Sequence, residues 1–455
     1  MCIRDRNNIC PPTDTTYICG NPPYLGSKVQ QQEHKADFAS YFGGQKYSKE
    51  LDYISLWFLK GADYLRETGA RLGLVSTNSV CQGQHVALLW PMILEGGMRI
   101  DFAHGSFLWS NGAVGRAGVT CVVVGLAERG NTNSPAKLYV DGIVRNVAQI
   151  SPYLVADGNM TVVKKRSEPI SPRVSMAFGC RPIDDGYLVL DEAEAFALVD
   201  TNPRTGKFIR PYLGASELLH STPRFCVWIS DGEVSEALQH AAISQRVEQV
   251  RQYRSASTSR DTPKWADRPH RFVYINHEEA QCLAAPGLCS ERRDYMPFTL
   301  LAAGSVLSNQ LYAAYEAAPW LLGLLHSSMH MAWVRTVAGR MKSDYRYSNT
   351  LCYNTFPFPD LGDEARKLLD DSALAILATR ERWPDRSLAD LYDPDKMPAN
   401  LRAAHDANDA LVDSLYRKKP FASDADRMEL LLAMYRDLVA EADKAKSTKS
   451  KKKGG

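Results

Sequence analysis

Tyr17-Ile18-Cys19-Gly20-Asn21-Pro22-Pro23-Tyr24 is the stretch that decides the fold. Tyr17 to Cys19 has the composition of a short strand, and Gly20 ends it. The Asn-Pro and Pro-Pro steps that follow favour a turn. Because an α/β sheet binds its ligands at the carboxyl ends of its strands, we expect the tetrapeptide from Asn21 to Tyr24 at a ligand-binding edge.

Apolar strands and amphipathic helices alternate from this stretch to about Leu126. Ser48 is expected to cap a helix. The apolar positions of that helix recur at helical spacing and are Leu51, Ile54, Phe58, Leu59 and Ala62. Further strands are expected at 71–76, 100–103 and 119–124, with a second helix ending near residue 95. The predicted fold class of this segment is α/β.

The residues of the tetrapeptide fit one kind of chemistry. An exocyclic amine of a nucleobase is a poor nucleophile, and a site that activates it must accept hydrogen bonds from its N–H groups. Asn21 Oδ1 and the carbonyl of Pro22 are two such acceptors, held rigid because proline fixes φ. Tyr24 offers a ring on which a base can stack. The alternative is a turn with no function.

Composition limits the remaining choices. With 45% hydrophobic and 23% charged residues, the 455-residue chain is typical of a globular protein with two or three domains. No apolar run reaches the roughly 18 residues that would span a membrane, and the start lacks a signal-peptide pattern, so we expect a cytoplasmic protein without membrane contact. The ten cysteines include no Cys-x-x-Cys pair, and no metal site is expected.

Four segments are expected along the chain. Residues 1–131 form the catalytic α/β unit, 132–360 a mixed α+β domain, and 361–443 a small helical unit. Residues 444–455 are rich in Lys and are expected to be disordered.

Two stretches of the mixed domain are candidates for nucleic-acid contact. The net charge is only +2, so such a surface must come from local clustering. Residues 244–274 hold seven Arg or Lys against three acids, and we expect phosphate contacts from Arg251, Arg254 and Arg260. An ordinary basic surface helix is the alternative.

The second stretch runs from Met341 to Thr350 and mixes donors, acceptors and aromatic rings. Lys342 and Asp344 are two residues apart and would share one side of an extended segment. Together they would match one G·C pair in the major groove, and Arg346 is a further base-reading candidate. The alternative is a solvated strand face.

The order of these features resembles the catalytic part of class I, S-adenosylmethionine-dependent DNA adenine-N6 methyltransferases, in particular the MmeI-like restriction-modification family. The resemblance is most specific at residues 20–28, 74–79, 102–111, 208–217 and 328–359. It implies the C-terminal half of a Rossmann-like sheet, followed by a target-recognition domain. It also implies catalytic roles for Asn21, Pro22, Pro23 and Tyr24, S-adenosylmethionine as cofactor, and double-stranded DNA with a flipped adenine as partner.

The chain departs from the family at its start. The donor-binding glycine loop of such enzymes lies well upstream of the tetrapeptide, and only twenty residues precede Asn21. We therefore expect the N-terminal nuclease and donor-binding segments to be lacking, and no cofactor-binding residue can be named.

Other functions fit part of the pattern. The same tetrapeptide occurs in methyltransferases that act on protein glutamine or ribosomal RNA, although the long downstream region argues against them. A fragment that binds DNA without transferring a methyl group is another alternative. Asn at the first position, instead of Ser, favours adenine over cytosine as the target.

Overall fold

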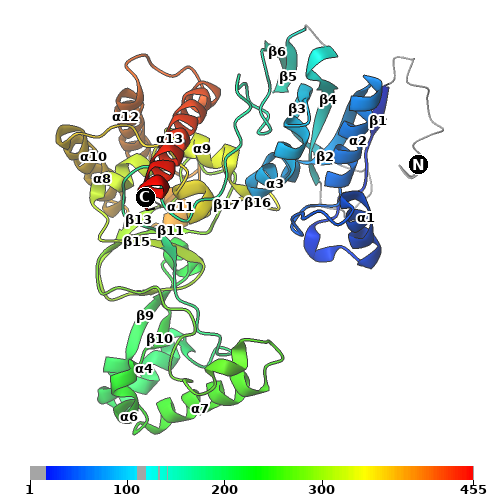
Figure 1. Ribbon diagram of the computed structural model, residues 1–455. Helices are drawn as coiled ribbons and strands as arrows, with labels where there is room; N and C mark the ends of the chain where they lie inside the picture. The colour runs from blue at the N-terminus through cyan, green and yellow to red at the C-terminus, as the bar shows by residue number, and fades with distance from the viewer. Residues whose placement is uncertain (1–16, 110–118, 132–133, 141, 454–455) are drawn as a thin grey trace.

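The computed structural model describes residues 17–109, 119–131, 134–140 and 142–453. Figure 1 shows a sheet unit in blue and cyan, a lobe in green, and a body formed by the remaining elements in yellow to red. Within the described residues, no helix is both long enough and apolar enough to span a membrane.

The sheet unit contains six strands in the order β1-β2-β4-β3-β5-β6. Their bounds are β1 Tyr17–Gly20, β2 Arg71–Thr77, β3 Met98–Trp109, β4 Val119–Glu128, β5 Ala136–Val140 and β6 Ile143–Val147. β1 is parallel to β2 and β3 to β5, whereas β4 runs antiparallel to both of its neighbours. The α/β class is confirmed, but the sheet continues to Val147, past the expected boundary at 131. The short, half-polar sequences of β5 and β6 gave no strong strand pattern.

Three helices accompany the sheet: α1 Gln32–Phe42, α2 Ser55–Thr68 and α3 Gly83–Leu94. The expected apolar positions of α2 are all buried, but the helix begins at Ser55, and Ser48 does not cap it. Residues 49–53 are instead held in an irregular connection, because Asp52 Oδ1 accepts a hydrogen bond from the backbone N–H of Leu25, outside the helix. The sequence analysis missed α1, in which only Phe38 is buried.

An irregular connection leads from the sheet unit to the lobe. The elements of the lobe are β8 Val189–Leu190, α4 Glu192–Thr201, β9 Ile209–Leu213, α5 Ala215–His220, β10 Phe225–Val227, α6 Val234–Ala237 and α7 Ala241–Ala256. β9 and β10 pair in an antiparallel manner, and β14 Val306–Leu307 joins their sheet from the returning chain. The lobe has a hydrophobic core of its own, which includes Phe208 and Phe272.

The returning chain builds two small sheets and two helices. Its elements, with β7 from the connection, are β7 Ala177–Phe178, β11 Cys282–Pro286, β12 Leu288–Cys289, β13 Thr299–Leu301, β15 Leu311–Tyr315, α8 Pro319–Leu325, α9 Ser328–Val337, β16 Gly339–Met341 and β17 Asp344–Arg346. The sheet orders are β13-β11-β15-β7 and β12-β17-β16. A π-helical turn at Asn349–Tyr353 follows. The expected mixed α+β character is confirmed.

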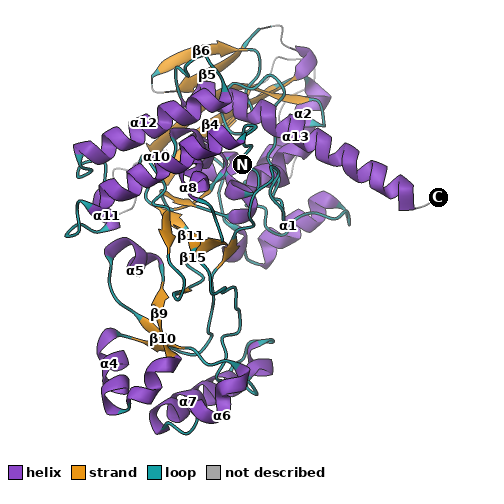
Figure 2. Cartoon of the chain, turned by 90° about the vertical axis from the view of Figure 1, so that its left-hand side faces the viewer, coloured by secondary structure: helices purple, strands orange, loops and turns teal. Residues whose placement is uncertain are grey.

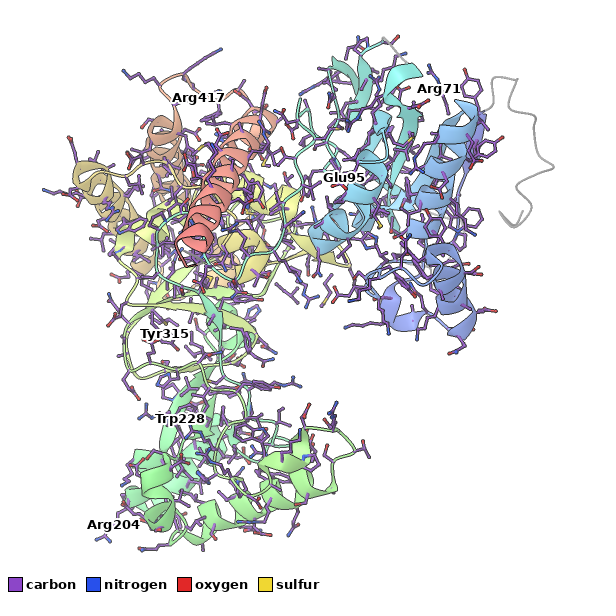
Figure 3. All side chains as sticks on the ribbon, in the orientation of Figure 1. Arg71, Glu95, Arg204, Trp228, Tyr315 and Arg417 are labelled. Atoms are coloured by element: carbon purple, nitrogen blue, oxygen red, sulfur yellow. The ribbon has the colours of Figure 1, made fainter. Side chains whose placement is uncertain are left out.

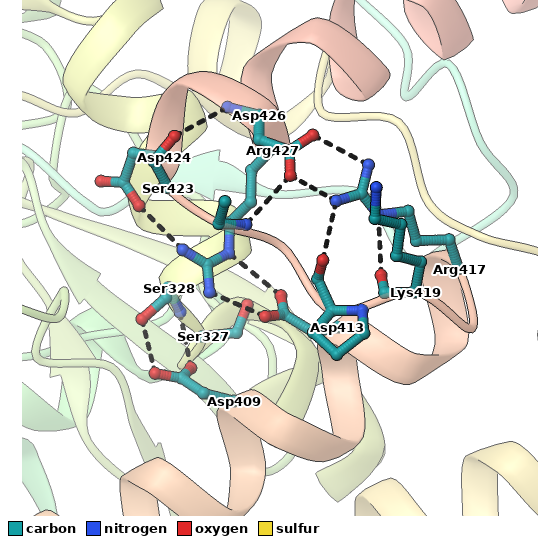
Figure 4. A network of polar contacts seen from close by, with 12 residues as sticks. Ser327, Ser328, Asp409, Asp413, Arg417, Lys419, Ser423, Asp424, Asp426 and Arg427 are labelled. Carbon is teal, nitrogen blue, oxygen red and sulfur yellow. Dashed lines mark hydrogen bonds and ion pairs between the residues drawn. The ribbon is translucent and has the colours of Figure 1, made fainter.

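The C-terminal segment is helical, as expected, with α10 Asp363–Glu381, α11 Leu388–Leu391, α12 Ala399–Tyr416 and α13 Asp424–Lys453. Of these helices, α10, α12 and α13 share a core with α8 and α9. Ion pairs also hold α12 against α13, since Arg427 on α13 pairs with Asp413 on α12 and with Asp424 on its own helix (Figure 4). The expectation of disorder from residue 444 onward is wrong as far as Lys453, because α13 continues to that residue and extends away from the body (Figure 2). Lys and Ala are good helix formers, and no Pro or Gly interrupts the segment before Gly454.

Candidate active site and DNA-reading surface

The tetrapeptide lies at the carboxyl edge of the sheet. β1 ends at Gly20, which pairs with Leu74 on the parallel strand β2, so the loop after each strand leaves the sheet at the same edge. Arg71, labelled at the top of Figure 3, begins β2 and marks the opposite edge. The edge that carries Asn21 therefore points toward the lobe and the small sheet β12-β17-β16.

Hydrogen bonds fix the loop that follows Tyr24. The backbone N–H of Leu25 donates to Asp52 Oδ1 at 2.9 Å, and its carbonyl accepts from the N–H of Tyr53 at 3.0 Å. The buried Gln30 side chain donates to the carbonyls of Leu25 and Leu51 at 3.0 and 2.9 Å. These bonds hold the tetrapeptide against the start of α2. Asp52 was missed in the sequence analysis, and its only signal was an acid among apolar residues.

Asn21 and Tyr24 are brought together at this edge. Asn21 is exposed, Pro22 is buried, Pro23 is exposed and Tyr24 is half-buried. Burial raises the pKa of the Tyr24 phenol above its usual value, and the neighbouring Cys121 thiol adds to the rise, while a hydrogen bond with the Asn21 side chain opposes it. A hydrogen bond that lowers the pKa of a phenol is one donated to its oxygen, so the Asn21 amide N–H is the donor and the Asn21 oxygen is left for a ligand.

The Cys121 thiol lies next to the Tyr24 phenol. The sequence analysis did not single out this cysteine. It is fully buried on β4, where it pairs with Thr77 on β2 and Phe107 on β3. Thr77 and Ser79 lie on the same edge, with 2.7 Å between their side-chain oxygens. Phe107, within the motif expected at 102–111, therefore lies near this edge of the sheet through its pairing with Cys121. The end of that motif, Asn111, lies outside the described residues.

The small sheet β12-β17-β16 carries the predicted base-reading residues, but in a different geometry. Met341 pairs with Asp344, so Lys342 and Ser343 form the two-residue loop of a hairpin, and Lys342 has a φ of 56°. The expectation that Lys342 and Asp344 share one side of an extended segment is therefore wrong. The chain turns between them because the Arg340 guanidinium holds the loop, donating to the Ser343 carbonyl at 2.7 Å.

One face of this small sheet is available to a ligand. Arg346 is exposed on β17, directly between Gly339 of β16 and Leu288 of β12. Asp344 lies two residues away, on the same face. Tyr345 points to the opposite face and is buried beneath the Arg340 guanidinium, which lies 3.9 Å from its ring centre. The structure therefore brings Asp344 and Arg346 together and sets Lys342 apart at the hairpin tip.

Arg254 is not available for DNA contact, which corrects the sequence-based expectation. It is fully buried in the lobe. Its guanidinium donates at 2.8 to 3.1 Å to five backbone carbonyls, those of Pro182, Ile183, Trp265, Arg268 and Arg271. A buried Arg with all of its donors satisfied holds these loops together and cannot reach a phosphate.

Arg251 and Arg260 remain candidates for phosphate contact. Both are exposed in the lobe, and Arg251 forms a surface ion pair with Glu248 at 3.1 Å. Such an exposed pair is weak and can yield to a phosphate.

The described residues do not fit a site for a methyl donor. The paired glycines of the sheet unit, at 43–44 and 96–97, follow helices, whereas a donor-binding loop follows a strand. We assign no described residue to the donor. Across the part of the chain that the structure describes, no group of three or more His, Cys, Asp or Glu side chains is arranged to hold a metal ion.

Comparison with known proteins agrees with this arrangement. The family description "MmeI, DNA-methyltransferase domain" matches residues 2–140, "MmeI, target recognition domain" matches 157–360, and "MmeI, C-terminal domain" matches 361–442. DNA methyltransferase A of Bacillus subtilis (strain 168) is 39% identical over 433 residues, which cover 95% of this chain and 49% of that protein.

A solved structure gives the same result. The Type IIL restriction-modification enzyme MmeI, determined in complex with DNA, is similar with a TM-score of 0.83 and 34% identity, over 93% of this chain and 57% of that one. The chain therefore spans about half the length of the relatives that it matches. Because the three domain descriptions follow one another along almost the whole chain, and both sequence and fold agree, the chain belongs to the MmeI family and carries its DNA-methyltransferase, target-recognition and C-terminal domains.

Proposed function

We propose that this chain carries the base-binding side of a site-specific DNA methyltransferase that transfers a methyl group from S-adenosylmethionine to adenine N6. The observation that carries the proposal is the placement of Asn21 at the carboxyl edge, exposed and hydrogen-bonded to the half-buried Tyr24. We further propose that the parent protein acts in the cytoplasm, in a restriction-modification system like that of MmeI.

Asn21 and Pro22 would act on the amine of the target base. The amine lone pair of adenine is delocalised into the ring, so acceptors aimed at its two N–H groups return electron density to N6. Asn21 Oδ1 and the Pro22 carbonyl are those acceptors. They are held in place by two consecutive prolines and by the hydrogen bonds of Leu25. S-adenosylmethionine would supply the methyl group.

Tyr24 would hold the flipped adenine by stacking, since a base inside a duplex cannot reach this edge. Cys121 and the residues around it keep the phenol half-buried and protonated. The phenol is thereby held beside the Asn21 side chain.

Two surfaces would bind the double-stranded DNA around the flipped base. Asp344 and Arg346 face outward from the small sheet and offer an acceptor and a donor to base edges. Arg251 and Arg260 on the lobe would contact phosphates, which hold the duplex without reading its sequence. A recognition region of this size favours DNA over a protein glutamine or ribosomal RNA as substrate.

The product of the reaction tests the proposal. A duplex library is incubated with the parent protein that contains this chain and with tritiated S-adenosylmethionine, and digested nucleosides are separated. We expect label in N6-methyladenine within one sequence motif, and a rise in 2-aminopurine fluorescence when that base replaces the target adenine. Label in N4-methylcytosine, RNA or protein would overturn the proposal. Specific binding without flipping or transfer would favour the non-catalytic alternative.

A further inference from the structure

The sheet unit and the small sheet β12-β17-β16 meet at two glycines, Gly83 and Gly339. Gly83 begins α3 with a φ of 62°, and a Cβ added to it would lie 2.9 Å from Cα and 3.2 Å from the backbone nitrogen of Gly339. The two backbones therefore touch directly at this point, with no side chain between them. A contact between two backbones cannot adjust by rotation of a side chain, so it fixes the distance between the two segments.

Gly83 is tied to the catalytic edge on its own side. The η2 turn Asn78–Cys81 leads from the end of β2 to α3, and Trp90 Nε1 holds that turn by donating to the Val80 carbonyl at 2.7 Å. In the first turn of α3, His85 Nε2 lies 2.9 Å from Ser55 Oγ at the start of α2.

The start of α2 is tied in turn to the tetrapeptide. Asp52 Oδ1 accepts from the N–H groups of Leu25 and Ile54 at 2.9 and 3.2 Å. Hydrogen bonds and short rigid turns therefore connect the loop of Asn21 and Tyr24 to Gly83.

Gly339 is tied to base reading on the other side. It is the residue directly opposite Arg346 in the β16–β17 hairpin. Any displacement of Gly339 moves Arg346 by a similar amount, because the ladder hydrogen bonds of the hairpin link the two strands.

We propose that the contact between Gly83 and Gly339 sets the spacing between the base that the hairpin reads and the adenine that enters the catalytic pocket. DNA holds these two bases at a fixed separation, so both units can engage only if the protein keeps the matching separation. A misplacement of about 1 Å can lower a rate by roughly 100-fold. Gly83 and Gly339 are thus positioning residues, and this assignment rests on the proposed function.

Gly83→Ala tests the assignment, with Gly97→Ala as the matched control. Gly97 has a φ of 86° and nothing within 4 Å of an added Cβ. Its substitution by Ala therefore adds the backbone strain of a positive φ but no steric clash with a neighbouring segment. Thermal unfolding of each variant shows how much stability the strain removes.

The measurements, made on the parent protein that contains this chain, are the dissociation constant for a duplex selected from a randomised library, 2-aminopurine fluorescence at the target position, and methyl transfer. We expect Gly83→Ala to bind DNA within about 3-fold of the wild type, while flipping and transfer fall by about 10-fold or more. The Gly97→Ala control should remain close to the wild type. Flipping by Gly83→Ala equal to that by Gly97→Ala would overturn the assignment.

If Gly83→Ala does not fold, Gly83→Asn tests the assignment instead. Asn tolerates a positive φ, and its Cβ still clashes with the backbone of Gly339. It should lose flipping as Gly83→Ala does, and unchanged flipping would again overturn the assignment. A wild-type protein that neither binds a selected site nor flips a base would contradict the proposed function itself. Normal flipping in the wild type and in all variants would contradict only the role of the glycine contact.

Discussion

Arg380 Nη2 lies 3.1 Å from Nε2 of His326, in the core that joins α10 to α8. The guanidinium also donates to the Tyr392 hydroxyl and the Phe298 carbonyl, both at 2.9 Å. His405 Nε2 lies 2.9 Å from the same hydroxyl. Burial and the Arg380 charge keep the pKa of His326 well below its usual value and lower that of His405 to about 3. Both rings are therefore neutral in the folded protein.

Stability should fall in mild acid. In the unfolded chain a His takes up a proton near pH 6.5, whereas the buried His326 and His405 do not, so lowering the pH favours unfolding. Between pH 6.5 and 5 each ring should remove about 2 kcal/mol from the free energy of unfolding. Urea denaturation at pH 7.5, 6 and 5 measures this, and His405→Gln should show a shallower dependence. Equal stability at pH 7.5 and pH 5 would contradict the burial of these rings.

Two arginines of α7, Arg254 and Arg251, should respond differently to substitution. Arg254→Met would leave buried carbonyls without donors, each at a cost of about 1 to 3 kcal/mol, so the lobe should lose about 3 kcal/mol or more of stability. Arg251→Met, on the same helix, removes an exposed side chain and should change stability by less than about 0.5 kcal/mol. Chemical denaturation and limited proteolysis measure both variants. Similar stabilities would argue against the buried role of Arg254.

Arg251 and Arg260 should contribute to DNA binding at every sequence alike. Each phosphate contact that is lost should reduce the slope of log K against log salt by about 0.9. Binding of Arg251→Ala and Arg260→Ala to specific and random duplexes, measured from 50 to 200 mM salt, gives this slope. An unchanged slope would place these residues away from the DNA.

Arg346 and Asp344 should determine sequence preference. Removing a good base contact relaxes discrimination by about 1 to 3 kcal/mol at one position, so Arg346→Ala should broaden the motif at a single base pair. Lys342→Gly is the matched control, because Lys342 is at the hairpin tip and its positive φ suits glycine. The motif bound from a randomised library shows the outcome. A motif unaltered by Arg346→Ala would remove the small sheet from base reading.

Local patterns predicted the strand that ends before Asn21 but not the contacts between distant segments. The strand before Asn21, the burial of Phe58 and Leu59, and the helices after Asp363 all follow from periodicity and turn residues within a few positions. The Asp52 carboxylate accepts a hydrogen bond from Leu25, 27 residues away. Because of this long-range bond α2 begins later than expected, and no local sequence pattern could have predicted it.

The expectations for the DNA-reading residues failed for related reasons. Arg254 belongs to a basic run, yet its partners Pro182 and Ile183 lie about seventy residues earlier and bury it. Lys342 has no Gly or Asn beside it to indicate a turn, although the pairing of Met341 with Asp344 requires one. Charge and spacing alone could not distinguish these positions from exposed residues of a helix or a strand.

Asn21→Ala provides the most direct test of the catalytic assignment. Asn21 is exposed, and under the proposed function it accepts a hydrogen bond from the reacting amine, so its loss should affect the transition state far more than DNA affinity. In the parent protein that contains this chain, transfer of tritiated methyl groups should fall by about 100-fold or more, a loss typical of removing one aimed hydrogen-bond partner from an active site. The dissociation constant of the selected duplex should stay within about 3-fold of the wild type. Wild-type transfer by the Asn21→Ala variant would contradict the assignment.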